Sequence, residues 1–316
     1  MKVGISLKDY TLQVPKDAIK LMEDRGLEVE YNQTGRWLSD AEFAEFLKDK
    51  AAVIGGLENY NSSTLENAKD LKIIARYGVG MDNMDLPYIK EKGIRVSTIV
   101  NHEPVAEFVV MQILALLKKL IPYDRNTRAG EWSCYSVRTV SAITLGIIGF
   151  GKIGKEVAKR MRPFGCRILV SDPFCDPKTA ESFGAELADN EQIFKTADVI
   201  TLHCPSIPQT YHLINKDTIA MMKDGACLVN ASRGAVVDEK VLYEALKSGK
   251  LAGAAADVFE TEPLPKDSPL RELDNLIITP HVAAQTDDQN YNCGMDCAQS
   301  IINVLLDGKD PVYTVI

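Results

Sequence analysis

The sequence predicts an α/β protein of two domains, each a parallel sheet covered by helices, with a cleft between them. The length of 316 residues suits two domains of about 150 residues each. Strand-like and helix-like segments alternate for most of the chain, which is typical of parallel sheets. They fall into two separate series, the second beginning at Thr144. We therefore expect one domain at residues 1–100 plus 287–316 and the other at residues 101–286.

Apolar, β-branched runs bounded by polar or glycine residues define the expected strands. In the first series they are Val3–Leu7, Val29–Tyr31, Ala52–Ile54, Ile73–Ala75 and Arg95–Ser97. In the second series they are Thr144–Phe150, Arg167–Ser171, Asp198–Leu202, Ala226–Asn230, Gly253–Asp257 and Leu276–Thr279.

Helical periodicity predicts the segments that cover these sheets. In the first series we expect helices at Asp17–Arg25 and Ser39–Lys50, the second capped by Ser39 with Glu42 three residues later. A long helix with an apolar stripe is predicted at His102–Leu120, followed by a loop through Trp132. The last helix is expected from Asp287 to Asp307, ending at Gly308.

Composition excludes several classes of function. The net charge of −8 opposes general nucleic-acid binding. Seven cysteines occur without a CxxC pair, so we expect no metal site and a reducing compartment, the cytoplasm. The N-terminus lacks an apolar signal core, and no apolar stretch is long enough to span a bilayer.

A glycine motif opens the second series. Gly149-x-Gly151-x-x-Gly154 follows a strand and begins a helix, which is typical of a Rossmann-like dinucleotide site. Lys152 and Ile153, between its last two glycines, are included in the expected site. The next strand ends at Asp172, whose carboxylate suits ribose hydroxyls and repels a 2′-phosphate. We therefore expect NAD as the cofactor, although a methyl-donor fold also uses a glycine loop and an acidic strand end.

Three later segments offer the groups needed to reduce a 2-keto acid. His281 can donate a proton to a carbonyl oxygen, because imidazole titrates near neutral pH. Glu262 is expected to orient and stabilise the protonated ring. Arg233 can bind a substrate carboxylate with two parallel hydrogen bonds.

The ordered segments GFGKIG, NASRGAVVDE, AADVFETEP and TPH resemble the D-isomer-specific 2-hydroxyacid dehydrogenase family, in a short, phosphoglycerate dehydrogenase-like form. The resemblance covers essentially the whole chain, since ARYGVGMDNMD near residue 80 also fits. It implies two Rossmann-like domains, a homodimer, and hydride transfer between NAD and a D-2-hydroxy acid. It also implies Arg233, Glu262 and His281 as the catalytic residues, with His281 the proton donor.

The resemblance assigns further residues to the cofactor and the substrate. Asp257 is expected to hold the nicotinamide carboxamide, and the residues expected along the cofactor are Cys204, Ala231 and Ser232. The backbone amides of Val79 and Gly80 are expected to bind the substrate carboxylate beside Arg233. Arg76 is expected to supply a positive charge to the substrate.

Two of the places where the sequence departs from the family bear on the expected cleft. Gly55-Gly-Leu-Glu58 replaces a common Arg-Ser pair. D-3-phosphoglycerate-like acids are among the possible substrates, and the missing arginine disfavours phosphoglycerate. His102-Glu103-Pro104 replaces smaller residues. An NAD(H)-responsive corepressor-like binding protein of the same family is the alternative function, disfavoured by the −8 charge. The expected partners are a small acid and a second copy of the chain, with no nucleic acid and no membrane.

Overall fold

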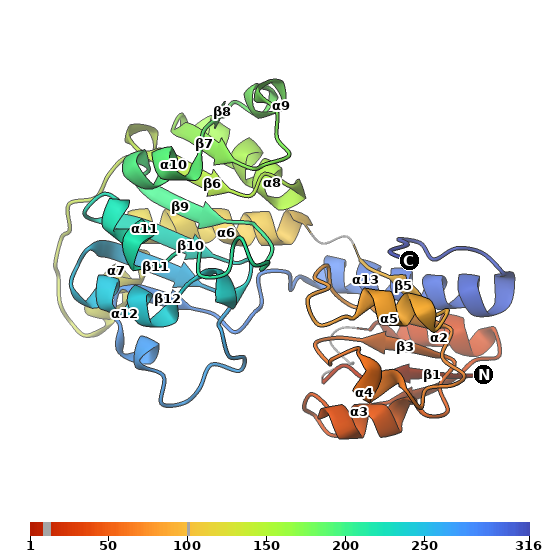
Figure 1. Ribbon diagram of the computed structural model, residues 1–316. Helices are drawn as coiled ribbons and strands as arrows, with labels where there is room; N and C mark the ends of the chain where they lie inside the picture. The colour runs from red at the N-terminus through yellow and green to blue at the C-terminus, as the bar shows by residue number, and fades with distance from the viewer. Residues whose placement is uncertain (9–13, 100–101) are drawn as a thin grey trace. The chain divides into compact units, whose positions relative to one another are not determined.

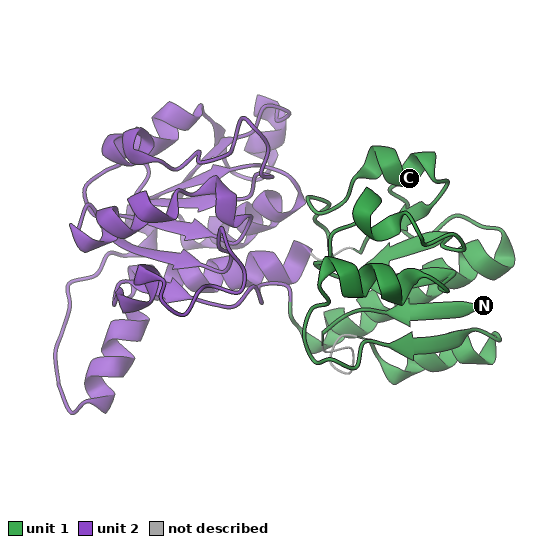
Figure 2. Ribbon diagram, turned by 60° about the horizontal axis from the view of Figure 1, so that its bottom comes forward, with its two compact units in different colours: residues 1–101, 285–316 green, residues 102–284 purple. Residues whose placement is uncertain are grey.

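The computed structural model describes residues 1–8, 14–99 and 102–316. These residues form two compact units, one made of Met1–Asn101 and Gln285–Ile316 and the other of His102–Ala284 (Figure 2). Each unit contains a parallel sheet with helices on its faces (Figure 1). The predicted α/β class is confirmed.

The sheet of the first unit has the strand order β2-β1-β3-β4-β5, with every pair parallel. This is the doubly wound order in which ligands bind beyond the carboxyl ends of the strands. The strands are β1 (Lys2–Ile5), β2 (Glu28–Tyr31), β3 (Ala52–Gly55), β4 (Ile73–Arg76) and β5 (Arg95–Ser97). The helices between them are α2 (Lys16–Asp24), α3 (Asp40–Leu47), α4 (Ser62–Leu65) and α5 (Leu86–Glu91). The predicted cap of α3 is confirmed, because Ser39 and Glu42 form a capping box.

The C-terminal segment completes the first unit. Helix α13 (Asp287–Ile302) packs against α2 and the strands β3 and β4, and continues as a π-helical turn to Asp307. Gly308, with φ of +62°, ends the helix. The backbone of Val96 in β5 then exchanges hydrogen bonds with residues 315 and 316.

The sheet of the second unit has the order β12-β11-β10-β9-β6-β7-β8, also all parallel. The strands are β6 (Thr144–Ile148), β7 (Arg167–Ser171), β8 (Glu186–Leu187), β9 (Val199–Leu202), β10 (Ala226–Asn230), β11 (Leu251–Ala256) and β12 (Leu276–Ile278). The order reverses between β6 and β9, and this switch point is where open α/β sheets bind ligands.

Helices cover both faces of this second sheet. The α-helices are α6 (His102–Leu117), α7 (Leu120–Arg128), α8 (Lys152–Met161), α9 (Pro177–Ser182), α10 (Asn190–Thr196), α11 (Lys216–Met221) and α12 (Glu239–Lys247). Short 3₁₀ turns lie at Val140–Ala142, Arg162–Phe164, Gly234–Val236 and Pro269–Glu272. Buried side chains of α6 and α8 share one core with the sheet, and those of α10, α11 and α12 share another.

The long helix predicted at His102–Leu120 is two helices. Helix α6 ends at Leu117, and Lys119 adopts a left-handed conformation with φ of 51°. A second helix, α7, then begins at Leu120 where a loop was expected. The left-handed residue breaks the α-helical hydrogen bonding, so the chain changes direction there.

The described residues contain neither a candidate membrane span nor a candidate metal cluster. Among the described residues, no helix has both the length and the apolar character needed to cross a membrane. The same residues contain no group of histidine, cysteine and acidic side chains arranged to hold a metal ion. All seven cysteines are free thiols.

Candidate active site

The predicted cofactor and catalytic residues of the second unit lie at one edge of its sheet. Because its strands are parallel, the segments that follow them all leave from the same edge (Figure 1). The glycine loop follows β6, Asp172 follows β7, and Cys204 lies two residues after β9. Arg233 follows β10, Glu262 follows β11 and His281 follows β12.

The glycine loop requires glycine at two of its positions. Gly149 has φ of +94°, and a Cβ there would lie 2.5 Å from the carbonyl carbon of His203. A Cβ on Gly154 would lie 2.3 Å from the carbonyl oxygen of Gly149. The loop therefore packs directly on the segment after β9, and α8 packs directly on the loop.

This loop fits a dinucleotide. Helix α8 begins at Lys152, and its N-cap residue, Gly151, has no side chain to occupy the first-turn amides. Apart from its neighbours in the chain, no atom of the described residues lies within 4 Å of where a Cβ of Gly151 would be. Free amides at a helix N-terminus bind phosphate well, because the helix dipole adds positive potential there.

Asp172 connects the loop to β7. Its two carboxylate oxygens accept hydrogen bonds from the backbone amides of Phe150 and Phe174, at 2.7 and 2.8 Å. Each oxygen has a second lone pair, so the carboxylate can still accept a hydroxyl. The side chain of Phe174 is 95% exposed.

Beyond β9, the predicted cofactor residue Cys204 is buried, and burial raises the pKa of its thiol to about 11. The neighbouring His203 is partly buried, and burial of its ring lowers the pKa of its imidazole to about 3. Both side chains are therefore uncharged at neutral pH.

The turn after β10 is organised by Asn230. Its side-chain oxygen accepts from the amide and hydroxyl of Ser232, and its amide nitrogen donates to the carbonyl of Arg233. A Cβ on Gly234 would lie 1.9 Å from the backbone of Phe259. Glycine at this position thus allows the segment of Arg233 to pack directly on the segment of Glu262.

Asp257 fixes the turn that carries His281. Its carboxylate is only 1% exposed and accepts hydrogen bonds from the Thr279 hydroxyl and the amides of Val282 and Ala283. Its backbone carbonyl accepts from the amide of His281 at 2.9 Å. The His281 backbone has φ of 55°, unusual for a residue with a Cβ. Strain of this kind persists where surrounding contacts determine the conformation.

Glu262 and His281 form a directly bonded pair. Nδ1 of His281 lies 2.7 Å from Oε2 of Glu262, and Oε1 accepts from the amide of Phe259 at 3.0 Å. The His281 side chain is 40% exposed, and that of Glu262 is 26% exposed. The structure thus brings the predicted relay pair together, and Nε2 of His281 takes no part in this hydrogen bond.

Electrostatics connects Arg233 to this pair. Burial acts to raise the pKa of Glu262, but the hydrogen bond and charge of His281, the Phe259 amide and the charge of Arg233 outweigh it. The net result is a pKa below the ordinary value of a glutamate. Glu262 is therefore ionised at neutral pH, and the three predicted catalytic residues belong to one electrostatic group.

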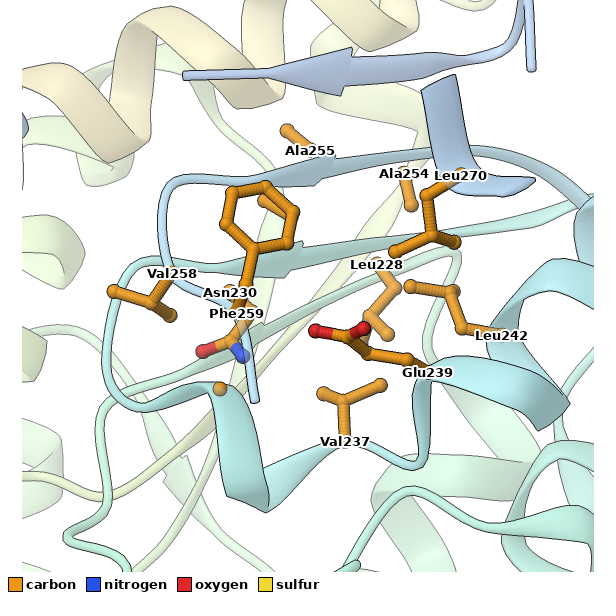
Figure 3. A pocket seen from close by; sticks show the side chains of 12 residues that line it. Leu228, Asn230, Val237, Glu239, Leu242, Ala254, Ala255, Val258, Phe259 and Leu270 are labelled. Atoms are coloured by element: carbon orange, nitrogen blue, oxygen red, sulfur yellow. The ribbon is translucent and has the colours of Figure 1, made fainter. Parts of the chain in front are cut away.

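A second acidic pair adjoins this group and was not predicted as part of the site. Oε1 of Glu239 accepts from the amide of Glu260 at 2.6 Å, and Oε1 of Glu260 accepts from the amide of Glu239 at 3.1 Å. His212 also contacts Oε1 of Glu260, at 3.1 Å. Glu239 lines a small, mostly apolar pocket with Phe259 (Figure 3). Burial and the charges of Glu260 and Glu262 raise the pKa of Glu239. These bonds join the start of α12 to the Glu262 loop, a long-range pairing that sequence spacing does not indicate.

The remaining predicted residues lie in the first unit, after β4. Val79 is 54% exposed, so its backbone lies at the surface. Arg76 is buried and donates to the carbonyls of Gly80 and Tyr77, at 3.2 and 3.3 Å. Its guanidinium thus supports the loop that includes Val79 and Gly80.

Comparison with known proteins identifies the family. Residues 110–283 match the model described as "D-isomer specific 2-hydroxyacid dehydrogenase, NAD binding domain". The chain is 34% identical to a glyoxylate reductase of Thermococcus litoralis, over 92% of this chain and 91% of the relative. This chain belongs to the D-isomer specific 2-hydroxyacid dehydrogenase family. Its second unit is the NAD-binding domain of that family, which confirms NAD as the predicted cofactor.

Other relatives agree on the family. The chain is 42% identical to a D-3-phosphoglycerate dehydrogenase of Methanocaldococcus jannaschii, over 92% of this chain and 56% of the relative. It spans about half the length of the curated relatives that it matches first. The TT0316 protein of Thermus thermophilus superposes with a TM-score of 0.90 at 32% identity, over the full length of both chains. A D-lactate dehydrogenase of Aquifex aeolicus, solved with NAD and lactic acid, superposes with a TM-score of 0.84 at 29% identity, over 100% of this chain and 99% of that chain.

Proposed function

We propose that this protein is an NAD-dependent dehydrogenase that interconverts a D-2-hydroxy acid and its 2-keto acid. The observation behind the proposal is the 2.7 Å bond between Glu262 and His281, at the same sheet edge as the NAD-binding glycine loop. A carboxylate bonded to Nδ1 leaves Nε2 to exchange a proton with the substrate.

The chemistry needs one hydride and one proton in each direction. Bound NADH supplies the hydride to the carbonyl carbon, and NAD⁺ accepts it in the reverse reaction. In the reduction, His281 gives the proton from Nε2 to the carbonyl oxygen. In the oxidation, His281 takes that proton from the hydroxyl, and Glu262 stabilises the positive ring that results. Arg233 binds the substrate carboxylate and attracts the developing negative charge on the oxygen.

We assign the other predicted residues as follows. Asp172 accepts from the ribose hydroxyls and selects NAD over NADP. The residues that contact the cofactor elsewhere are Gly149, Gly151, Lys152, Ile153, Gly154, Cys204, Ala231, Ser232 and Asp257. The amides of Val79 and Gly80 bind the substrate carboxylate, with Arg76 supporting their loop. The contacts of Asp257 with the turn of His281 add a positioning role to its proposed contact with the nicotinamide carboxamide.

The test is turnover with a panel of 2-keto acids, measured as the loss of NADH absorbance. His281→Ala should reduce kcat by at least about a hundredfold, because general acid–base catalysis is worth that much, while NADH affinity changes little. His212→Ala is the matched control, because His212 also has a positive φ and also contacts a glutamate, at 3.1 Å. Equal losses in the two variants would count against the role of His281.

The corepressor-like alternative differs in the same assay. A binding protein would bind NADH, but it would not oxidise NADH with any acid of the panel. The relatives named above are dehydrogenases or reductases by name, which supports the enzyme.

We further propose that the protein is a homodimer that pairs through α6, α7 and the loop at residues 129–139. Helix α7 has no buried residue, and it and the loop extend away from the sheet of the second unit (Figure 2). The exposed apolar side chains there are Met111 (49%), Leu120 (57%), Ile121 (49%) and Trp132 (91%). Apolar surface of this kind is typical of protein–protein contacts. Leu120→Glu with Trp132→Ser should give a monomer in light scattering, whereas Phe174→Ser, which changes another exposed aromatic ring, should not.

We assign the protein to the cytoplasm, because its seven cysteines are unpaired and suit a reducing compartment. Its proposed partners are a small 2-hydroxy or 2-keto acid and a second copy of the chain. We propose no nucleic-acid partner and no membrane partner.

A further inference from the structure

The loops at the carboxyl edge of the first sheet indicate which side chain the substrate carries, in addition to its carboxylate. The loop after β3 and the loop after β4 are hydrogen-bonded to each other at this edge. The amide of Tyr77 donates to the carbonyl of Gly55 at 2.8 Å, and the side chain of Asn83 donates to the carbonyl of Gly56 at 3.2 Å. A ligand bound at the amides of Val79 and Gly80 therefore has the loop after β3 beside it.

Neither Gly55, the last residue of β3, nor Gly56, the first residue of the loop, leaves room for a longer side chain. A Cβ on Gly55 would lie 1.9 Å from the hydroxyl of Tyr60, which is fully buried. A Cβ on Gly56 would lie 2.4 Å from the ring of Trp37. The space that a basic side chain would need at these two positions is therefore filled by aromatic groups.

The buried charges at this edge are Glu58 and Arg76. Glu58 is 4% exposed, and one of its oxygens accepts from the amide of Gly56 at 2.8 Å. Burial raises the pKa of Glu58, and the positive charge of Arg76 opposes that rise. Arg76 itself is 5% exposed and donates to backbone carbonyls of its own loop. It therefore acts as a support of the loop, facing a glutamate.

Other charged residues follow the neighbouring strands. Arg36, after β2, is paired with Glu42 at 2.6 Å, and Asp82 and Asp85 follow β4. Lys8, after β1, is exposed, with its ammonium 5.9 Å from the centre of the Trp37 ring. The sequence at 9–13, DYTLQ, contains no lysine or arginine. The exposed side chains of the two facing loops include Leu57 (44%) and Val79 (54%), both apolar.

We infer that the substrate is a 2-hydroxy acid whose side chain is uncharged and carries no phosphate. A phosphate dianion placed beside Leu57 and Val79 would lose water without gaining a cation from these two loops, because residues 56–61 and 77–85 contain no lysine or arginine and Arg76 is buried on backbone carbonyls. A hydroxymethyl or aliphatic side chain would instead contact Leu57 and Val79 and leave the buried glutamate undisturbed. This inference rests on the proposed function, and it separates this chain from the relatives named as phosphoglycerate dehydrogenases.

The first experiment compares kcat/KM with NADH for phosphohydroxypyruvate, hydroxypyruvate and 4-methyl-2-oxopentanoate. We expect at least one unphosphorylated acid to exceed phosphohydroxypyruvate by about tenfold or more, the equivalent of one lost charge-assisted contact. Preference for phosphohydroxypyruvate would overturn the inference and leave the proposed dehydrogenase intact. If no acid of a broad panel supported NADH oxidation, the proposed function would instead be refuted.

Two variants then test the physical reason. Leu57→Arg adds a cation at an exposed position of the loop, and it should raise kcat/KM for phosphohydroxypyruvate about tenfold relative to hydroxypyruvate. Leu187→Arg, at a position of similar exposure in the second unit (39%), is the matched control and should leave the ratio unchanged. Lys8→Gln should also leave the ratio unchanged. An unaltered ratio in Leu57→Arg, or a selective loss of phosphohydroxypyruvate activity in Lys8→Gln, would contradict the inference.

Discussion

Replacing Glu262 with glutamine removes one charge from the proposed relay and keeps its shape. The glutamine oxygen can still accept from the amide of Phe259, which Oε1 of Glu262 accepts at 3.0 Å. The group that faces Nδ1 of His281 changes from a carboxylate to a neutral amide. With that oxygen engaged, the glutamine nitrogen faces Nδ1 of His281 and can only donate to it, so the variant removes both the charge and the acceptor of a ring Nδ1–H.

The structure allows the size of this effect to be worked out. The bonded atoms are 2.7 Å apart, which places the charge centres about 4 Å apart. Because the side chain of His281 is 40% exposed, an effective dielectric constant of about 40 is suitable, and the pair then gains ~2 kcal/mol. During oxidation of the hydroxy acid, the ring becomes positive as it accepts the proton. Loss of ~2 kcal/mol at that stage lowers kcat about thirtyfold.

The assay is formation of NADH from NAD⁺ and the best D-2-hydroxy acid of the panel, at saturating concentrations of both. Glu260→Gln is the control, because Glu260 also contacts a histidine and its glutamine oxygen can still accept from the Glu239 amide. A kcat for Glu262→Gln within about threefold of the wild type, with thermal stability unchanged, would refute the electrostatic argument.

Three more predictions follow from the second unit. Gly154→Ala should destabilise the protein by about 1–3 kcal/mol in urea unfolding and weaken NADH binding, since its Cβ would meet the Gly149 oxygen at 2.3 Å; equal stability would show that α8 shifts freely. Asp172→Asn should reduce the preference for NADH over NADPH about tenfold in kcat/KM, because it removes a charge that repels the 2′-phosphate; an unchanged ratio would mean that Asp172 does not set it. The pKa of Glu262 is lowered in the folded protein, so its contribution to stability is present above the unfolded value of about 4.3 and is lost as pH falls through the lower folded value. In urea titrations, the stability advantage of the wild type over Glu262→Gln should therefore begin to shrink below about pH 4.3 and should disappear below the lower folded pKa, and an advantage that did not shrink below about pH 4.3 would contradict the assignment.

Sequence patterns were sufficient for the elements whose signal is local. The apolar runs at Arg95–Ser97, Arg167–Ser171 and Ala226–Asn230 are strands with the predicted bounds. The pairing of Glu262 with His281 was also expected, since both were placed at strand ends that share an edge. Parallel strands bring such residues together regardless of their separation in the chain.

Features that depend on tertiary contacts could not be predicted in the same way. Lysine seldom adopts a left-handed conformation, so nothing at Lys119 indicated the break between α6 and α7. Strand β8 has only two residues, Glu186 and Leu187, both exposed, and gives no apolar run. The bonds between Glu239 and Glu260 join residues 21 apart through packing of separate loops. The packing of Tyr60 over Gly55 is equally invisible in the sequence.

The first unit is discontinuous, and this affects the order in which the protein can form during synthesis. Its strands leave the ribosome before residue 101, but α13 and the segment that pairs with Val96 follow residue 284. Until then, the apolar face formed by α2, β3 and β4 lacks the buried side chains of α13, including Cys297, Ile301 and Ile302. Since domains generally fold as units, we expect the inserted NAD-binding unit to complete its fold first. While residues 102–284 are being synthesised, the nascent chain therefore exposes this apolar face, and a chaperone that binds apolar segments can act on it during that interval.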